Sequence, residues 1–273
     1  MSSDPADAAR HLAAARSFLF VPGDRPERFA KAADSGAGLV IVDLEDAVAP
    51  GDKERARRSA ADWPGLGART VVRVNPPGTP WFDADLAMAA GRGCPVMLPK
   101  AEDPAVVAAV AGRVPLIVLV ETALGIERAF AVCSVPGVAR AALGNVDLSA
   151  QLGIAHDDTA ALAHARARLV MASAAAGIAP PVDGVTTAVR DLAALAADTA
   201  HARRMGFTAK LCVHPFQVGP VADAFAPSDA ELRWARSVVG AGDSATTVDG
   251  QMIDRPVLER ARGMLARAGS PAG

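Results

Sequence analysis

Short apolar runs that each end in polar side chains recur along this chain, and this alternation constrains the fold more than any other feature. The ends carry, in order, Asp43, Glu45 and Asp46; Arg73 and Asn75; Lys100; Glu121; Asn145 and Asp147; Asp183; and His214. The segments between the runs read mostly as helices. In a parallel α/β barrel the carboxyl ends of all strands lie on one face, so we expect these side chains to share one pocket.

Eight apolar runs fit the strands of such a barrel: 17–21, 39–43, 70–74, 95–98, 115–120, 139–144, 180–183 and 209–213. Helical segments at 26–35, 52–62, 83–91, 103–112, 124–134, 157–177 and 187–205 alternate with them. Eight strands that alternate with seven helical segments in a chain of 273 residues match one (β/α)8 TIM barrel. We therefore predict an α/β barrel over residues 1–226, preceded by a short flexible N-terminus.

The residues after 226 depart from this alternation. Ser228 is followed three residues later by Glu231, the pattern of a capping box that opens a helix. A turn, the segment VDGQMID and a final helix RPVLERARGMLARAG follow. We predict that residues 227–273 form a C-terminal helical extension, which closes the barrel or covers it as a lid.

Composition restricts the partners of this protein. The net charge is −2 and basic residues are interspersed with acidic ones, which gives a nucleic-acid partner no electrostatic support. No apolar run approaches the roughly 20 residues of a membrane span, and the N-terminal segment lacks a signal-peptide core. We expect a cytoplasmic protein with neither nucleic-acid nor membrane partners. The three widely spaced cysteines suggest neither a disulfide framework nor a zinc site.

Two carboxylates, Glu121 and Asp147, are the strongest candidates for a metal site. They follow the fifth and sixth predicted strands, which are neighbours in a barrel. Two carboxylates that leave the other positions to water and substrate oxygens suit Mg²⁺. The alternative is that each carboxylate caps a following helix, Asp147 at the turn of Leu148 and Ser149.

Arg73 lies on a strand that is otherwise apolar, so its guanidinium needs an anionic or polar partner. An ion pair with Asp43 or Glu45 and a contact with a substrate carbonyl or carboxylate are equally compatible with this position. Asp43 and Glu45 share one face of their strand, and Asp46 follows. We expect these three acids to orient metal-bound water and Arg73 rather than to transfer protons.

Four further residues admit more than one interpretation. His214 is a possible general base, although a single histidine at a strand end is more often a hydrogen-bonded structural group. Lys100 is a possible Schiff-base lysine, but the carboxylate-rich surroundings favour its charged, non-nucleophilic form. Arg25 and Lys31 flank the start of the first helix, where a phosphate is able to bind, although exposed charges on a solvated helix are the ordinary explanation.

Eight segments of the sequence, taken together, resemble the citrate lyase β-subunit-like (CitE-like) family of the HpcH/HpaI aldolase superfamily. They are RSFLFVPGDRPERFAKA, VIVDLEDAVAPGDKERAR, VVRVNPPGTPWF, VMLPKAE, ETALGIE, LGNVDLS, MGFTAKLCVHPFQV and DGQMIDRPV. They occur in the family's order and with similar spacing from about residue 16 to residue 269. One departure is the segment TAK at 208–210, where relatives usually have glycine before the lysine, which puts a close backbone contact in doubt there.

The resemblance implies a Mg²⁺-dependent enzyme that cleaves or forms a carbon–carbon bond between an acetyl thioester and a small 2-oxo acid. By position, Glu121 and Asp147 match the family's metal ligands, and Arg73 matches its carbonyl-polarising residue. Arg25 and Lys31 match contacts to the thioester carrier, coenzyme A (CoA). Asp254 matches an acid/base residue that reaches a neighbouring subunit's pocket, which implies a homo-oligomer, a trimer or a hexamer.

The expected substrate is a 3-hydroxyacyl-CoA of the malyl, citramalyl or citryl type. A citrate lyase β subunit that acts on citryl-acyl-carrier protein is an alternative within the same fold. A hydroxy-keto-acid aldolase that uses free pyruvate is a second alternative, and it would not need Arg25, Lys31 or Asp254. The sequence leaves the acyl group of the substrate open.

Overall fold

Eight parallel strands form a closed barrel in sequence order in the computed structural model, which describes residues 5–241, 246–248 and 251–269. The strands are β1 (Ser17–Pro22), β2 (Leu39–Asp43), β3 (Thr70–Arg73), β4 (Val96–Leu98), β5 (Leu116–Val120), β6 (Val138–Leu143), β7 (Ala179–Asp183) and β8 (Ala209–Cys212). Pairing of β8 with β1 closes the barrel, with Phe18 opposite Leu211. The predicted (β/α)8 barrel is confirmed, and each predicted strand agrees with the observed one to within a residue at either end.

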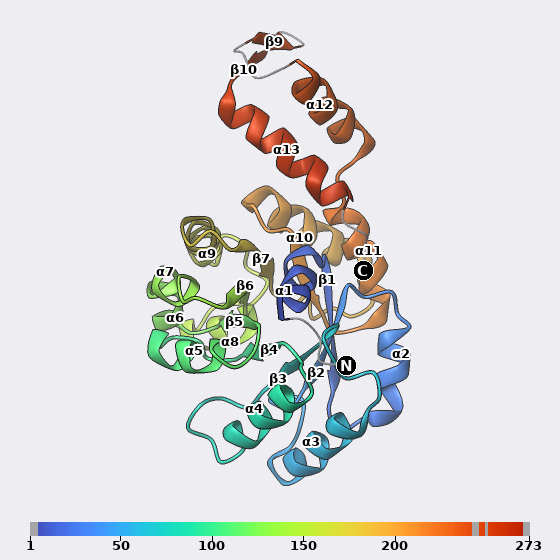
Figure 1. Cartoon of the computed structure of the whole chain (residues 1–273), viewed down its shortest axis with the longest axis vertical. Helices are drawn as coiled ribbons and strands as arrows, with labels where there is room; N and C mark the ends of the chain where they lie inside the picture. Colours follow the sequence, from blue (N-terminus) through green and yellow to red (C-terminus); the bar gives the residue numbers. More distant parts are fainter. Residues whose placement is uncertain (1–4, 242–245, 249–250, 270–273) are drawn as a thin grey trace.

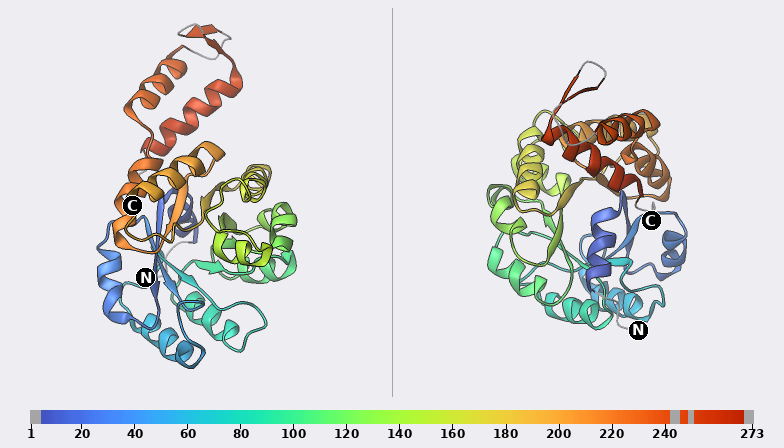
Figure 2. Two further views of the ribbon diagram at one scale, coloured as in Figure 1. Left: turned by 180° about the vertical axis from the view of Figure 1, so that it is seen from behind. Right: turned by 45° about the horizontal axis from the view of Figure 1, so that its top comes forward.

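Helices surround the strands, as the right-hand view of Figure 2 shows. They are α2 (Phe29–Ala33), α3 (Lys53–Asp62), α4 (Phe82–Gly91), α5 (Pro104–Ala111), α6 (Ala123–Glu127), α7 (Ala129–Cys133), α8 (Asn145–Leu152), α9 (Ala163–Ala175), α10 (Leu192–Met205) and α11 (Pro215–Phe225), with 3₁₀ turns at Pro26–Arg28 and Pro50–Asp52. The main apolar core lies between strands and helices and includes Leu44, Val96 and Leu169. Burial of these side chains supplies the main driving force for this layered arrangement.

Several helix boundaries differ from the prediction. Helix α8 was not predicted, because it starts directly after β6 without an apolar period of its own. The predicted helix 157–177 begins at Ala163, and the predicted helix 187–205 begins at Leu192. In the second case Asp191 supplies the N-cap by accepting hydrogen bonds from the backbone of Ala193 and Ala194.

The N-terminal segment, expected to be short and flexible, contains helix α1 (Pro5–Ala14), and Leu12 of this helix is fully buried. The guanidinium of the buried Arg140 donates to the carbonyls of Leu12 at 2.9 Å, Ala15 at 2.7 Å and Pro180 at 2.8 Å. A cation at a helix C-terminus is stabilised by the negative end of the helix dipole. Burial nevertheless lowers the pKa of Arg140 to about 9. Helix α1 thus covers the barrel end at which the strands begin.

The C-terminal extension projects from the barrel beside α10 and α11 (Figure 1; left-hand view of Figure 2). It contains α12 (Asp229–Gly240), the antiparallel strands β9 (Thr246–Val248) and β10 (Gln251–Ile253), and α13 (Arg255–Gly269). The predicted capping box is present, because Ser228 and Glu231 each accept a hydrogen bond from the other's backbone. The two helices share a small core of Ala235, Val238, Leu258, Ala261 and Met264. The predicted helical extension is therefore confirmed, with a two-stranded ribbon that was not predicted.

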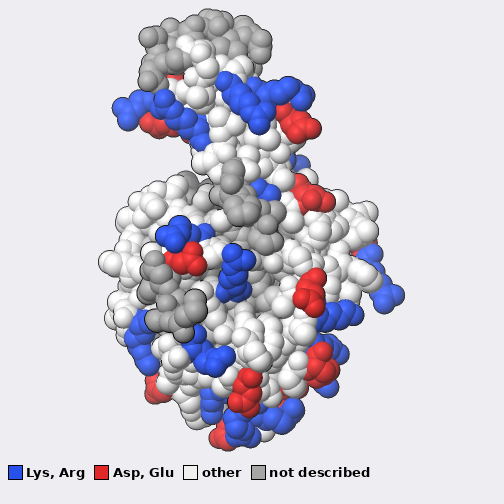
Figure 3. All heavy atoms as spheres, turned by 45° about the vertical axis from the view of Figure 1, so that its right-hand side comes forward, with Lys and Arg blue, Asp and Glu red and all other residues white. Residues whose placement is uncertain are grey.

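An ion pair joins the extension to the barrel. Arg203 of α10 lies 2.6 Å from Glu231 of α12, between Nη2 and Oε2. Acidic and basic side chains are interspersed on the face in Figure 3, and the basic side chains on the extension there are arginines. Among the described helices, none has the length and apolar character of a membrane span.

Candidate active site at the carboxyl ends of the strands

A cavity of about 410 Å³ lies at the carboxyl ends of the barrel strands. Its wall includes Asp43, Asp46, Arg73, Glu121, Asn145 and Asp147. These residues come from β2, β3, β5 and β6 or from the segments that directly follow them. The expectation that polar strand ends converge on one pocket is met for these six residues, because parallel strands in a closed barrel end on the same face.

Glu121 and Asp147 meet at the ammonium group of Lys100. Lys100 Nζ lies 3.3 Å from Glu121 Oε1 and also contacts Asp147 Oδ2. The backbone N–H of Lys100 donates to the same Glu121 oxygen at 2.9 Å. Burial raises the pKa of the Glu121 carboxyl, and the charge and hydrogen bonds of Lys100 partly oppose this rise. A buried carboxylate at this position therefore depends on a neighbouring cation.

Neither of these carboxylates serves as a helix cap. The N-cap of α6 is Thr122, whose hydroxyl accepts the Gly125 N–H at 3.0 Å. Helix α8 has Gly144 at its N-cap and no side-chain cap. The alternative interpretation of Glu121 and Asp147 as capping residues is wrong.

Gly144 allows the end of β6 to approach Glu121. A Cβ atom at position 144 would lie 2.3 Å from Glu121 Cβ and 2.6 Å from Glu121 Oε2. Both distances are shorter than real Cβ contacts, so any larger residue would displace the carboxylate. The sequence contained this signal as the glycine in LGNVD.

The two carboxylates fit a magnesium ion. Mg²⁺ binds through one or two protein carboxylates and takes its remaining ligands from water and substrate oxygens. Among the described residues, no group of three or more His, Cys, Asp or Glu side chains is arranged to hold a metal. Glu121 and Asp147 lie at an open cavity and already bind a cation, the Lys100 ammonium. This donor set suits Mg²⁺ and differs from that of a structural metal site, in which the protein supplies every ligand.

Arg73 makes a bidentate ion pair with Asp43. Its Nε donates to Asp43 Oδ1 at 2.7 Å and its Nη2 donates to Asp43 Oδ2 at 2.6 Å. Its Nη1 lies 2.9 Å from Glu45 Oε2 and 3.4 Å from Asp46 Oδ2. Burial lowers the pKa of Arg73, but the three acids outweigh burial and raise it. The predicted ion pair with Asp43 is confirmed, whereas contact with a substrate stays a prediction, for which the guanidinium is placed at the cavity wall.

The loop after β2 keeps Arg73 in this orientation. Asp43 accepts the N–H of Glu45 at 2.9 Å and that of Ala47 at 3.2 Å, which fixes its carboxylate. Glu45 is buried, and burial raises its pKa to about 8 against the lowering effect of Arg73. The contact of Glu45 Oε2 with Arg73 is close but is not an aligned hydrogen bond. The acids therefore hold Arg73 in place, and their predicted orientation of metal-bound water stays a prediction.

Sequence reasoning missed two residues that support the site, Lys53 and Asp85. The ammonium of Lys53 donates to the carbonyls of Leu44 at 2.9 Å and Glu45 at 2.7 Å, and thereby holds the same loop. Asn75 donates through its side chain to the buried Asp85 at 2.6 Å. Lys53 and Asp85 lie on covering helices, 8 to 10 residues from their partners in sequence. Only the packing of those helices brings them to the site.

His214 caps a helix and does not line the cavity. Its Nδ1 accepts the backbone N–H of Phe216 at 3.2 Å, at the start of α11. Its predicted structural role is confirmed by this contact. Asp183 does not line the cavity either. It is fully buried in ion pairs with Lys210 at 2.8 Å and Arg166 at 3.0 Å.

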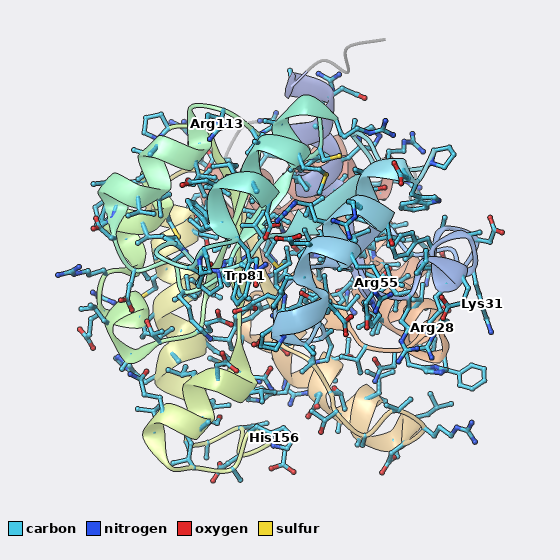
Figure 4. The ribbon with its side chains drawn as sticks, turned by 90° about the horizontal axis from the view of Figure 1, so that it is seen from below. Arg28, Lys31, Arg55, Trp81, Arg113 and His156 are labelled. Atoms are coloured by element: carbon cyan, nitrogen blue, oxygen red, sulfur yellow. The ribbon has the colours of Figure 1, made fainter. Side chains whose placement is uncertain are left out.

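Arg25, Lys31 and Asp254 lie apart from the cavity wall. Arg25 precedes the 3₁₀ turn that leads into α2, and its side chain is 56% exposed. Lys31 is exposed on α2, on the same side of the molecule as Arg28 and Arg55 in Figure 4. Asp254 accepts the N–H of Val257 at 3.2 Å at the start of α13, so in its own chain it caps a helix.

Comparison with known proteins places these features in context. The HpcH/HpaI aldolase/citrate lyase family model matches residues 16–215. A citrate lyase subunit beta-like protein of Mycobacterium tuberculosis is 41% identical over 269 residues, which cover 94% of this chain and 97% of that protein. A (3S)-malyl-CoA thioesterase of Cereibacter sphaeroides is 34% identical over 268 residues, covering 93% and 94% of the two chains.

A solved structure of CitE from M. tuberculosis, in complex with magnesium, acetoacetate and coenzyme A, is also similar to this chain. It aligns with a TM-score of 0.83 and 40% sequence identity, and the alignment covers 94% of this chain and 99% of that one. The similarity therefore includes the barrel and most of the C-terminal extension.

Proposed function

The chain belongs to the HpcH/HpaI aldolase/citrate lyase family, and we propose that it is a Mg²⁺-dependent carbon–carbon lyase. Its proposed substrate is a 3-hydroxyacyl-CoA of the malyl, citramalyl or citryl type, which it cleaves to acetyl-CoA and a small 2-oxo acid or forms from them. The observation that carries this proposal is that Arg73, Glu121 and Asp147 line one cavity. The similar CitE structure contains magnesium, acetoacetate and coenzyme A.

Glu121 and Asp147 are the proposed magnesium ligands. Bound there, Mg²⁺ would supply a Lewis acid and a template for the oxygen atoms of the acid fragment. Glu121 is buried and Asp147 is 35% exposed, so the first fixes the position of the site and the second faces the solvent side of the cavity. Because Gly144 has no side chain, the Glu121 carboxylate occupies this position without a steric clash.

Arg73 is the proposed carbonyl-polarising residue. Cleavage removes the proton of the 3-hydroxyl group, forms the carbonyl of the 2-oxo acid and expels the enolate of the acetyl thioester. Negative charge develops on oxygen atoms in this step, and a guanidinium already held by Asp43 stabilises it without reorganisation. Glu45 and Asp46 complete the set of acids that orient the guanidinium.

Asp254 is the proposed acid/base residue, acting in the pocket of a neighbouring subunit. It would protonate the enolate carbon during cleavage and remove a methyl proton during synthesis. Its position at the start of α13, in an extension that projects from its own barrel, supports action on a second copy of the chain. We therefore propose a homotrimer or homohexamer in which residues 227–273 form a lid, and a cytoplasmic location for this enzyme.

Arg25 and Lys31 are the proposed contacts for the phosphates of CoA. A cavity of about 410 Å³ accommodates the acyl group and the end of the pantetheine arm but not the whole cofactor. The nucleotide would therefore lie outside, where both basic side chains are exposed. Exposed cations favour phosphate binding with a strong dependence on ionic strength.

An assay with (3S)-malyl-CoA, citramalyl-CoA and citryl-CoA tests the proposal. We expect Mg²⁺-dependent release of acetyl-CoA, together with glyoxylate, pyruvate or oxaloacetate, respectively, from one of these substrates, and no release after treatment with EDTA. Activity with citryl-acyl-carrier protein alone would identify a citrate lyase β subunit. Activity with free pyruvate and an aldehyde alone would identify a hydroxy-keto-acid aldolase.

A thioesterase is a second candidate function, favoured by the similarity to the (3S)-malyl-CoA thioesterase. The two activities differ in the bond that breaks. A thioesterase releases malate and free CoA, whereas a lyase releases glyoxylate and acetyl-CoA. Separate measurement of free thiol and of acetyl-CoA from the same reaction distinguishes them.

A further inference from the structure

Lys100 has an unusual backbone. Among the residues that the structure describes, it is the only non-glycine residue with a positive φ, at 51°. This left-handed conformation is unfavourable for a lysine, whose side chain has no local hydrogen bond to offset it. Strain of this kind persists where surrounding contacts determine it, and it is found disproportionately at functional sites.

The strained backbone places two donors of Lys100 on the proposed metal ligands. The backbone N–H is 2.9 Å from Glu121 Oε1, and the ammonium is 3.3 Å from the same oxygen while it contacts Asp147 Oδ2. The ammonium is therefore located between the two carboxylates. A magnesium ion bound by both would need oxygen atoms at about 2.0–2.1 Å and would occupy this same space.

The side chain of Lys100 also borders a second cavity. This cavity has a volume of about 250 Å³ and is lined by Lys100, Glu102 and apolar residues that include Pro76 and Val107. The side chain of Lys100 is 34% exposed and is thus free of tight packing. Glu102 accepts a hydrogen bond from Thr122 at 2.7 Å, which holds a carboxylate at this second cavity.

We propose that Lys100 is a positioning residue with two sites: its ammonium holds Glu121 and Asp147 together in the metal-free enzyme and moves toward Glu102 when Mg²⁺ binds. This inference rests on the proposed magnesium site, where the Lys100 ammonium would compete with Mg²⁺ for Glu121 and Asp147. The ammonium balances the charge of two neighbouring carboxylates that would otherwise repel each other. Magnesium binding then includes the cost of displacing the ammonium, which weakens the apparent affinity.

The variant Lys100→Met tests this inference by calorimetric titration with MgCl₂. Methionine keeps the backbone N–H and a similar chain length but has no charge. We expect Mg²⁺ to bind about tenfold more tightly than in the wild type, as expected for the loss of a half-buried competing ion pair. The conservative variant Lys100→Arg retains a cation and is expected to lack this gain.

Thermal unfolding supplies a second measurement that does not depend on catalysis. In EDTA, Lys100→Met is expected to unfold at a lower temperature than the wild type, because both carboxylates are left without their cation. Saturating Mg²⁺ should then raise its melting temperature by more than it raises that of the wild type. Arg113→Met is the matched control, since Arg113 is exposed and precedes β5, at the barrel end away from the cavity.

The outcomes separate this inference from the proposed function. Unchanged or weaker Mg²⁺ binding by Lys100→Met, with normal binding by the wild type, would overturn the displacement of Lys100 and leave the lyase proposal standing. If the wild type does not bind Mg²⁺, or if Glu121→Gln leaves its binding unchanged, both the displacement of Lys100 and the proposed magnesium site are overturned. A melting temperature of Lys100→Met in EDTA that equals that of the wild type would overturn the positioning role in the metal-free enzyme.

Discussion

Replacement of Glu45 by glutamine should stabilise the metal-free protein at neutral and alkaline pH. Glu45 is 4% exposed, and burial raises its pKa from 4.5 to about 8 although Arg73 opposes the rise. The folded state therefore binds the proton more tightly than the unfolded state does. The contribution of this residue to the unfolding free energy must fall as pH rises from about 4.5 to about 8. Glutamine resembles the protonated acid in shape and is never ionised.

The magnitude follows from the size of the pKa shift. Each pKa unit corresponds to about 1.4 kcal/mol of differential stability, so a rise from 4.5 to about 8 corresponds to an upper limit of roughly 5 kcal/mol above pH 8. At pH 7 the same relation gives a cost of roughly 3 kcal/mol for ionised Glu45. At pH 4 the two proteins should differ by little, because both states of the wild type are largely protonated.

Urea unfolding of both proteins in EDTA, at intervals from pH 4 to pH 9, measures this difference. Subtraction of the two curves removes the contribution of the titrating groups that do not interact with Glu45. Glu54→Gln is the matched control, because the Glu54 side chain is 68% exposed and its ion pair with Arg58, at 3.7 Å, lies on the surface. A difference between Glu45→Gln and the wild type that does not grow between pH 5 and pH 8 would refute the reasoning. Lower stability of Glu45→Gln at pH 8 would refute it as well.

Other substitutions test the remaining parts of the site. Glu121→Gln and Asp147→Asn should each abolish Mg²⁺-dependent turnover while circular dichroism shows an intact fold; near-normal activity of either at limiting Mg²⁺ would contradict the proposed ligands. Arg73→Lys should lower kcat by on the order of 10²-fold or more, because an ammonium cannot reproduce the bidentate fork, and a change in KM alone would reduce Arg73 to a binding group. Gly144→Ala should weaken Mg²⁺ binding measured by calorimetry, since its Cβ would lie 2.6 Å from Glu121 Oε2; unchanged affinity would show that the loop yields. Asp254→Asn and Glu121→Gln subunits, each inactive alone, should regain part of the activity in mixed oligomers, whereas no recovery in verified mixtures would exclude action of Asp254 on a neighbour.

The sequence by itself determined the architecture. Eight apolar strand-forming runs that alternate with helical segments have few alternatives to a parallel barrel, because parallel strands require crossovers and their apolar faces must be covered. The same periodicity placed each strand to within one residue. It also located the polar part of the cavity wall, since residues at the ends of parallel strands share one face irrespective of their separation in sequence.

The tertiary structure decided what each polar group contacts. Arg73 was equally compatible with an ion pair and with a substrate contact. Only the pairing of β2 with β3, which sets Asp43 opposite Arg73, allows the observed bidentate ion pair. The alternative of capping for Glu121 and Asp147 was removed by Thr122 and Gly144, whose roles depend on where the helices begin. The alternative contacts of these side chains differ little in local free energy, so the packing of neighbouring helices and strands determines which contact forms.

The N-terminal helix and Lys100 illustrate the limit most clearly. Helix α1 is held by Arg140, which donates to the carbonyls of Leu12 and Ala15 although it lies more than 120 residues away in the sequence. The left-handed backbone of Lys100 likewise has no local cause, because lysine disfavours it. Local sequence determines which elements form through periodicity and capping, whereas burial, charge pairing and strain arise from long-range contacts that exist only after the barrel has closed.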